Sequence, residues 1–296
     1  MFCQEKGTSG FIHTKDSGDY MILSFHPMIE ADKNILCAGR EPGETDKEAI
    51  KNARAVILPQ GCRISLYQMA VKHCPHVFPN YDAMLQYPGK TGQIRLFQKW
   101  NVPHPDSLVF DSLEQWYQAK NFQAVFPCVF KFSWGGEGHT VYYIASQKDL
   151  DTQIARAEKF ERTGQYGFII QKFIPCQGRS LRMVIVNQSI ASYWRVQSDS
   201  FYSNIAKGAT IAYDIEPGLV ESAKSLMIDF CNKTHINLAG FDFIFHEKHR
   251  SPLFLEINYF FGRKGLGGGE AFYTMLVSGI KDWLKRVDNN INEGKL

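Results

Sequence analysis

The chain has 296 residues, of which 44% are hydrophobic and 21% are charged, and its formal net charge at pH 7 is +3. This apolar content is enough for a substantial core, in one large domain or in several smaller ones. The balanced charge and the absence of a long Lys/Arg block argue against a dedicated nucleic-acid binder. No apolar run approaches the roughly 20 residues that span a bilayer, and no signal-peptide pattern is visible. We therefore expect a cytoplasmic protein with neither nucleic-acid nor membrane partners, whose seven scattered cysteines are reduced thiols.

The first part of the sequence predicts alternating strands and helices. The expected strands are 20–25, 34–39, 55–60 and 76–80, and the expected helices are 44–55 and 62–73. In the first helix we predict Thr45 as the N-cap, with Glu48 three residues later completing a capping box. Strand and helix alternation favours a small parallel α/β domain, which we place at residues 1–85.

The elements expected after residue 82 do not alternate regularly between strand and helix. Residues 82–90 indicate a turn-rich junction, and two prolines in 101–110 end the helix expected at 92–100. The following segments predict helices at 112–120, 147–162, 217–234 and 270–287, a strand at 167–173, a strand–loop–strand unit at 126–144, an antiparallel pair at 180–186 and 189–196, and a glycine-rich loop at 262–269.

Two apolar, strand-like runs, 240–245 and 252–258, each carry an acid in the middle. A buried carboxylate without a partner is costly, because the protein interior cannot solvate its charge. If the runs form a hairpin, Asp242 lies roughly opposite Glu256, and Glu256 shares a face with Asn258. Like charges that face each other destabilise a sheet, whereas three oxygen ligands suit Mg²⁺, which usually takes substrate phosphates as further ligands. The pattern predicts a Mg²⁺ site for a nucleotide, and a surface hairpin with solvated acids is the alternative.

A glycine-rich loop follows Lys131 in the sequence SWGGEGH. Gly135, Gly136 and Gly138 would let the backbone approach an anion and point N–H groups at it. Lys131 would add a compact positive charge. The loop is not a P-loop, because the GxxxxGK[ST] spacing is absent. It predicts a phosphate-binding loop, with a flexible hairpin turn as the alternative.

Taken in order, the motifs GK…VPHP, VFKFSWGGEG, IIQKFI…GRSLRMVIV, YSNIAKGA, LAGFDFIF and LFLEIN resemble the ATP-grasp superfamily, in the branch of RimK-type ligases and glutathione synthetases. The resemblance covers about residues 85–290. It implies an α/β (α+β) ATP-grasp fold at 86–296 with a flap subdomain at about 103–172. The small parallel α/β domain at 1–85 then corresponds to the N-terminal, substrate-side (pre-ATP-grasp) domain of the family.

The resemblance also implies roles for individual residues. Lys90 and Lys131 match the two ATP lysines, residues 133–138 match the flap over the triphosphate, and residues 171–174 match the hinge whose backbone meets adenine. The implied nucleotide-binding residues are Lys90, Lys131, Ser133, Gly135, Gly136, Gly138, Gln171, Lys172, Phe173, Ile174 and Ser180. The implied catalytic residues are Arg182, Arg195, Asn204 and Lys207, and the implied Mg²⁺ ligands are Asp242, Glu256 and Asn258.

The sequence departs from the family in two places. Ser180 stands where these ligases usually have an acid that grips the ribose hydroxyls, so nucleotide affinity or specificity is expected to differ. After Asn258 the chain reads YFFGRKGLGGG, in which Arg263 and Lys264 would clamp a substrate carboxylate or form a solvated basic turn. In the N-terminal domain, the candidate acceptor contacts are Gln60, Arg63 and Tyr81, each with a structural role as the alternative.

The implied activity is ATP- and Mg²⁺-dependent ligation. One or two Mg²⁺ ions are expected, with Mn²⁺ as an alternative. A carboxylate would be activated as an acyl phosphate and attacked by an amine or a thiol, with release of ADP and phosphate. The expected partners are small-molecule or peptide carboxylates and amines, and a homo-oligomer is an alternative to a monomer. A non-catalytic ATP-binding module and an ATP-grasp kinase remain competing interpretations.

Overall fold

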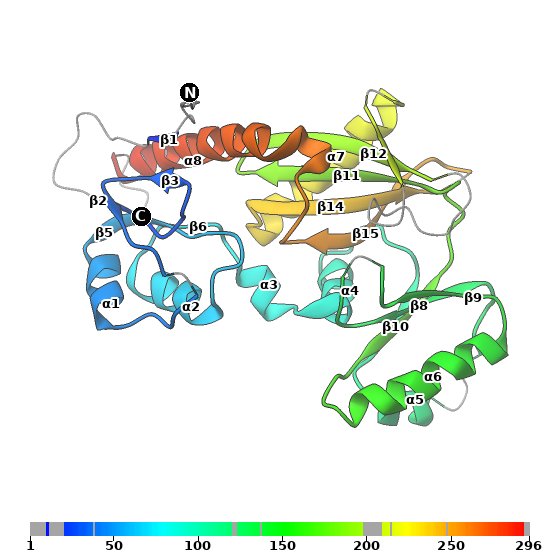
Figure 1. Cartoon of the computed structure of the whole chain (residues 1–296). Helices are drawn as coiled ribbons and strands as arrows, with labels where there is room; N and C mark the ends of the chain where they lie inside the picture. The colour runs from blue at the N-terminus through cyan, green and yellow to red at the C-terminus, as the bar shows by residue number, and fades with distance from the viewer. Residues whose placement is uncertain are drawn as a thin grey trace, which may run out of the picture.

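The structure is a computed structural model that describes residues 10–11, 21–37, 39–119, 123–136, 138–197, 209–213, 215–246 and 248–292. Figure 1 shows the N-terminal elements in blue and cyan beside a large sheet in yellow-green to orange. A smaller sheet with two helices, in green, lies below the large one, and the long helix α8 (Gly268–Asn292) runs along the top. No helix in this described part of the chain is long and apolar enough to serve as a membrane span.

The N-terminal sheet is four-stranded and parallel, with the strand order β4-β2-β5-β6. Its strands are β2 (Met21–Ser24), β4 (Lys33–Asn34), β5 (Ala53–Ile57) and β6 (Val77–Phe78). The accompanying helices are α1 (Glu44–Lys51) and α2 (Ile64–His73), and β1 (Gly10–Phe11) pairs separately with β3 (Ile29–Glu30). The prediction of a small parallel α/β unit is confirmed.

Two local predictions in this unit were wrong. The strand expected at 34–39 is limited to β4, because this exposed edge strand pairs with only two residues of the short strand β2. Thr45 is not the N-cap of α1; Gly43 is, and its N–H donates to the carboxylate of Asp46 at 2.7 Å. Arg40 binds the same carboxylate, so this ion pair fixes Asp46 where it caps the helix.

The central sheet is five-stranded and antiparallel, with the order β13-β12-β11-β14-β15. Its strands are β11 (Arg179–Val186), β12 (Ser189–Val196), β13 (Thr210–Ala212), β14 (Leu238–Phe245) and β15 (Pro252–Asn258). Both predicted hairpins, β11–β12 and β14–β15, are confirmed, whereas β13 was not predicted. The chain then passes through the 3-10 turn η2 (Lys264–Leu266) into α8.

The two faces of the central sheet are covered differently. Residues 181, 183 and 185 of β11 pack in the core beneath α7 (Pro217–Thr234). On the opposite face, Val184 and Val186 pack against α8. Gly279 permits this close approach, because a Cβ at that position would lie 2.7 Å from a Val186 methyl carbon. Ser180 and Arg182 share the face of the two valines but fall outside its apolar cluster, so polar groups occupy that end of the face.

The peripheral sheet is antiparallel, with the order β7-β10-β8-β9. Its strands are β7 (Ser107–Phe110), β8 (Cys128–Phe132), β9 (Val141–Ile144) and β10 (Phe168–Lys172), and its helices are α5 (Leu113–Gln118) and α6 (Gln147–Glu161). Phe130, Phe132 and Phe168 face the helices in one apolar core. Lys131 and Gln171 alternate with them and therefore face the other way.

The link between the N-terminal and peripheral sheets contains more structure than predicted. The junction expected at 82–90 includes α3 (Asp82–Gln86) and the start of α4 (Gly89–Lys99). Strand β7 was missed because the prolines before it indicated a break, yet it begins just after them and pairs only with β10. An edge strand tolerates neighbouring prolines, because one of its sides needs no ladder hydrogen bonds.

Candidate functional site

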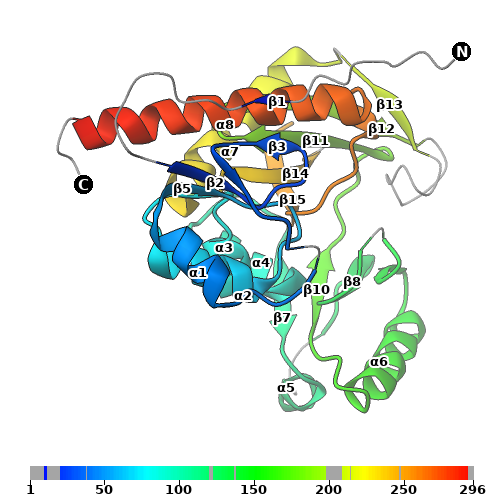
Figure 2. The ribbon, with the colours of Figure 1, turned by 60° about the vertical axis from the view of Figure 1, so that its left-hand side comes forward.

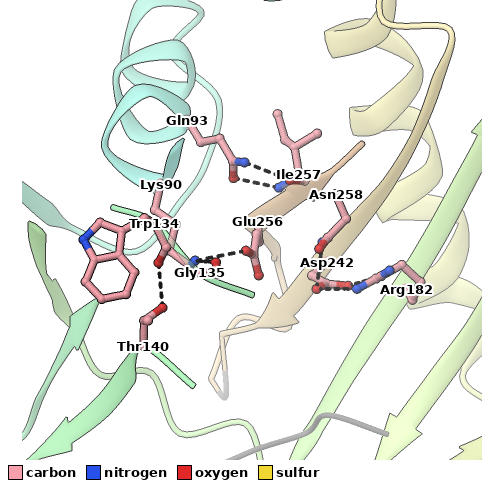
Figure 3. A network of polar contacts seen from close by, with 10 residues as sticks. All are labelled: Lys90, Gln93, Trp134, Gly135, Thr140, Arg182, Asp242, Glu256, Ile257 and Asn258. Atoms are coloured by element: carbon pink, nitrogen blue, oxygen red, sulfur yellow. Dashed lines mark hydrogen bonds and ion pairs between the residues drawn. The ribbon is translucent and has the colours of Figure 1, made fainter. Parts of the chain in front are cut away.

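Polar side chains from the central sheet, the peripheral sheet and α4 meet where the end of the central sheet faces the peripheral sheet and the N-terminus of α4 (Figure 3). The central sheet contributes Arg182 from β11, Arg195 from β12, Asp242 from β14, and Glu256 and Asn258 from β15; the peripheral sheet contributes Lys131 from β8; and α4 contributes Lys90. The structure thus brings together seven residues that the sequence predicted as site residues.

Asp242 lies at the centre of this cluster. It pairs with Glu256 in the β14–β15 ladder, as predicted from the sequence. Its carboxylate accepts hydrogen bonds from Nε and Nη2 of Arg182, and Nη2 of Arg195 lies 2.8 Å from Oδ1. Burial by itself would raise the pKa of Asp242, but the two arginine charges outweigh it and hold this pKa below its ordinary value. Asp242 is therefore ionised at neutral pH.

Glu256 lies opposite Asp242 on β15, and Asn258 lies two residues further along the same strand. Asn258 Nδ2 donates to Asp242 Oδ2 at 3.3 Å, and Glu256 Oε1 is 3.7 Å from Lys90 Nζ. No point in the described ranges gathers three His, Cys, Asp or Glu side chains. Two carboxylates and one amide are a hard, all-oxygen donor set, which fits a Mg²⁺ ion that completes its shell with water and phosphate oxygens.

Gln93 of α4 is a site residue that the sequence did not indicate. Its side-chain amide donates to the carbonyl of Ile257 at 2.8 Å and accepts from the Ile257 N–H at 2.9 Å (Figure 3). These bonds satisfy the open edge of β15 between Glu256 and Asn258. Gln93 therefore fixes the strand segment from which both proposed metal ligands project.

Lys131 places a positive charge in a buried part of the candidate site. Lys131 is 7% exposed, and none of the residues that the structure describes forms a hydrogen bond or ion pair with its ammonium group. Burial lowers its pKa to about 8; the negative charge of Glu256 opposes this lowering, the charge of Lys90 adds a smaller lowering, and Asp242 opposes it further. An anion placed here would stabilise the ammonium form.

The base of the glycine-rich loop is attached to the start of α4. The Lys90 N–H donates to the Ser133 carbonyl at 2.8 Å, and Lys90 Nζ donates to the Gly135 carbonyl at 2.6 Å. The hydroxyls of Thr91 and Ser133 are 2.8 Å apart. Lys90 is thus held by the loop on one side and lies near Glu256 on the other.

Gly135 adopts a conformation that requires glycine. Its φ is +82°, and a Cβ at this position would lie 2.5 Å from Cγ2 of Thr140. The Thr140 hydroxyl donates to the Trp134 carbonyl at 2.8 Å, which closes the loop (Figure 3). Gly136 is exposed, Gly138 has a φ of 72°, and residue 137 between them lies outside the described residues.

The predicted hinge at 171–174 begins in the last two residues of β10. Gln171 is buried and donates to the Ser107 hydroxyl at 2.8 Å, and the Lys172 N–H donates to the Asp106 carbonyl at 2.8 Å. Phe173 packs edge-on against Tyr143, and Ile174 is half-buried. Backbone contacts from Lys172 and Ile174 to an adenine remain a prediction.

Ser180 is fully buried, and its hydroxyl accepts a hydrogen bond from Arg195 Nε at 3.1 Å. It therefore orients Arg195, and contact with a ribose remains a prediction. Two other predicted site residues, Asn204 and Lys207, lie outside the residues that the structure describes.

The N-terminal candidates have structural partners. Gln60 donates to the Tyr259 carbonyl at 3.1 Å, and Arg63 forms an ion pair with Glu41. Tyr81 is 1% exposed and lies in the core between the N-terminal and central sheets. Gln60 and Tyr81 thus join the N-terminal unit to Tyr259 in the loop that follows β15, whereas the Arg63 ion pair lies within that unit.

Comparison with known proteins gives structural but no sequence matches. No protein-family model matches the chain, and no curated protein matches its sequence. The structure is similar to a RimK domain protein ATP-grasp from Sphaerobacter thermophilus, with a TM-score of 0.57, 16% identity, and coverage of 77% of this chain and 81% of that chain. D-alanine–D-alanine ligase from Bacillus anthracis has a TM-score of 0.58 and 13% identity over 87% of each chain.

A third similar structure is carboxyaminoimidazole ribonucleotide synthase from Aspergillus clavatus complexed with ATP. Its TM-score is 0.51 at 14% identity, with coverage of 74% of this chain and 56% of that chain. Identities at this level establish the architecture and not the reaction. The parallel N-terminal sheet, the antiparallel peripheral and central sheets, and these three similarities agree with the sequence resemblance. The chain therefore has the ATP-grasp fold.

Proposed function

We propose that the protein is an ATP- and Mg²⁺-dependent ligase that joins a carboxylate to an amine or a thiol and releases ADP and phosphate. The observation that carries this proposal is the meeting of four cationic side chains with three oxygen ligands in the ATP-grasp fold. The proteins of similar structure include a ligase and a synthase complexed with ATP, which supports the same class of reaction.

The cationic residues have separate proposed roles. Lys90, Lys131 and the loop at 133–138 would bind the triphosphate, and the hinge at 171–174 would bind adenine through its backbone. Asp242, Glu256 and Asn258 would hold Mg²⁺, which neutralises charge on the phosphates when it is bound. Asn204 and Lys207 are proposed to complete the site from the adjacent segment.

The proposed reaction has two steps. An oxygen of the substrate carboxylate attacks the γ-phosphorus, the bond to the ADP oxygen breaks, and an acyl phosphate forms. The amine or thiol then attacks the acyl carbon, phosphate leaves with its bridging oxygen, and the nucleophile loses its proton to solvent. Arg182 and Arg195 would stabilise the negative charge that develops on the phosphoryl and carboxyl oxygens. Their fixed positions beside Asp242 mean that little reorganisation is needed during the reaction.

Turnover is the first test of this proposal. Purified protein would be incubated with Mg·ATP and pools of amino acids, short peptides and polyamines, and ADP and phosphate would be followed by ³¹P NMR. We expect ADP and phosphate that depend on the pool and are lost in Glu256→Ala. The matched variant Glu221→Ala, in an exposed ion pair on α7, should retain turnover. Intact ATP with every pool, with ATP binding confirmed separately, would contradict a ligase of these substrate classes.

A further inference from the structure

Arg263 carries a positive charge that the described residues leave without an ion-pair partner. Its guanidinium lies over the rings of Phe272 and Tyr273, at 4.8 and 4.6 Å from their centroids. Its carbonyl accepts the N–H groups of Leu266 and Gly268, which closes the turn around it. No carboxylate in the described part of the chain forms an ion pair with Arg263. The two aromatic rings and the turn therefore hold the guanidinium in place, and none of its N–H donors is paired with a carboxylate of the described residues.

His26 lies beside this guanidinium, two residues after the end of β2. It is 7% exposed, and its N–H donates to the Ser24 hydroxyl at 3.1 Å, which in turn donates to the Ile29 carbonyl at 2.7 Å. The Met28 N–H donates to His26 Nδ1 at 3.1 Å, so the ring proton is on Nε2. Burial, and then the charge of Arg263, lower the pKa of His26 to about 4. At neutral pH it therefore presents one neutral N–H donor.

Tyr273 brings the two donors together. Its ring contacts His26 edge-to-face, with centroids 6.0 Å apart, and also lies under Arg263. Figure 2 shows how the chain after β15 rises to the start of α8, above the N-terminal strands. Because β2 belongs to a parallel sheet, its carboxyl end is the edge at which such sheets bind ligands.

The loop between β15 and α8, which carries Arg263, also lies against the candidate site. The backbone of Gly265 lies against the ring of Tyr193, which pairs with Arg182 in the β11–β12 ladder. Phe261 lies beside Gly240, next to the Arg182 side chain. Arg263 and His26 therefore lie on the side of this loop that faces the N-terminal sheet, while Arg182 lies on the side that faces the central sheet. The N-terminus of the 25-residue helix α8 adds positive potential on the Arg263 side.

We infer that Arg263 and His26 Nε2–H bind a second carboxylate of the acid substrate, which makes that substrate a dicarboxylate such as a diacid or an acidic amino acid. This inference rests on the proposed ligase function, in which the other carboxylate is phosphorylated near Arg182. A planar guanidinium matches a carboxylate through two parallel hydrogen bonds. One positive charge and one neutral donor match the single charge of a carboxylate better than the double charge of a phosphate monoester.

Binding can be tested without turnover. Succinate, glutarate, aspartate and glutamate would be titrated calorimetrically into the full chain, each beside the acid in which a methyl group replaces the distal carboxylate: butyrate, pentanoate, 2-aminobutyrate and norvaline. At least one diacid should bind at least about tenfold more tightly than its matched monoacid, because the monoacid lacks the charged, hydrogen-bonded pair with Arg263. Equal affinities in all four pairs would overturn the inference.

Variants then assign the preference to residues. Arg263→Met should remove it and leave monoacid affinity unchanged, and Arg263→Lys should restore only part of it, because an ammonium lacks the bidentate fork. Arg286→Met is the matched control: this exposed arginine near the other end of α8 has the same charge, and its loss should leave the preference intact. A preference that survives Arg263→Met would also overturn the inference.

The outcomes separate the two proposals. A diacid preference that depends on Arg263, with no ADP formed from any acid and amine, would sustain the carboxylate site and contradict the ligase. ADP formation that is equal for diacids and their monoacid partners would sustain the ligase and contradict the second-carboxylate site. In turnover assays, the inference predicts that Arg263→Met raises KM for the diacid with little change in kcat.

Discussion

The guanidinium of Arg182 and the carboxylate of Asp242 form a paired contact across the neighbouring strands β11 and β14, with Nη2 and Oδ2 2.9 Å apart. Both side chains are more than nine-tenths buried, and Arg195 binds the same carboxylate. The carboxylate proposed to bind a metal is thus also the counter-ion of two buried arginines. Its removal should affect both folding and ligand binding.

Asp242→Asn should destabilise the protein by about 3 kcal/mol or more, because it leaves two buried guanidinium groups without their counter-ion. The free energy of unfolding would be measured in denaturant. The double variant Asp242→Asn/Arg182→Met should recover part of the loss, because one of the unpaired charges is removed. A single variant as stable as the wild type would show that the arginines do not depend on Asp242.

Lys131 should make ATP binding depend on pH. Its pKa of about 8, against 10.5 for a free side chain, leaves it largely neutral at pH 9. A bound phosphate stabilises the ammonium form, so ATP should bind with uptake of up to about one proton at pH 9 and with almost none at pH 6.5. Calorimetry in buffers of different ionisation enthalpy measures this uptake.

Lys131→Arg is the matched control for that experiment, because a guanidinium stays protonated and should bind ATP without proton uptake. The unfolded chain binds more protons than the folded chain between pH 8 and 10.5, so this lysine should also make the free energy of unfolding rise across that window. Proton uptake that is unchanged in Lys131→Arg would assign the titration to another group.

Gln93→Leu should weaken the site without unfolding the protein. It removes two hydrogen bonds to Ile257 and leaves the edge of β15 open, at a cost of about 1–3 kcal/mol. Mg²⁺-dependent ATP affinity should fall, because Glu256 and Asn258 lose their fixed positions. Gln98→Leu, at an exposed position of the same helix, should change neither quantity. Unchanged ATP affinity in Gln93→Leu would contradict the positioning role.

Gly279→Ala should destabilise the packing of α8 on the central sheet. The added methyl group would lie 2.7 Å from a Val186 carbon and 2.9 Å from the Val186 carbonyl oxygen, so the helix must shift. Overpacking of this kind costs about 1–3 kcal/mol, which exceeds the gain in helix propensity. Ser278→Ala, at the neighbouring exposed position, should be neutral or stabilising in thermal unfolding. Equal stability of the two variants would contradict this packing.

That the two acids face each other could be predicted from the alternation of side chains and the short connection between the runs, but the exact register could not, because it shifts between Asp242 and Phe243. Asp242 and Glu256 pair as expected. The contact of Gln93 could not be predicted, since its partner is a backbone edge 164 residues away that no side-chain pattern marks. The same holds for His26, whose neighbour Arg263 is brought to it only by the packing of α8.

The ion-pair and hydrogen-bond partners of the site residues were harder to predict than which residues belong to the site. The resemblance placed Arg182 and Arg195 near the phosphates, but it did not indicate that both bind Asp242, because strand order is decided by tertiary packing. Ser180 was interpreted as a departure at the ribose, whereas its pairing with Arg195 across β11 and β12 gives it a buried partner. A sequence therefore indicates which residues gather at such a site more readily than which atoms bind.

The acyl phosphate is the central claim, and oxygen transfer tests it most directly. Pooled acids labelled with ¹⁸O in their carboxylates would be incubated with Mg·ATP, pooled amines and the protein, and the phosphate would be examined by ³¹P NMR for the isotope shift. The account predicts phosphate that carries one ¹⁸O, because the acid's own oxygen bridges to phosphorus and leaves with it. Unlabelled phosphate would indicate hydrolysis by water, a stable phosphorylated acid would indicate a kinase, and either result would contradict a ligase.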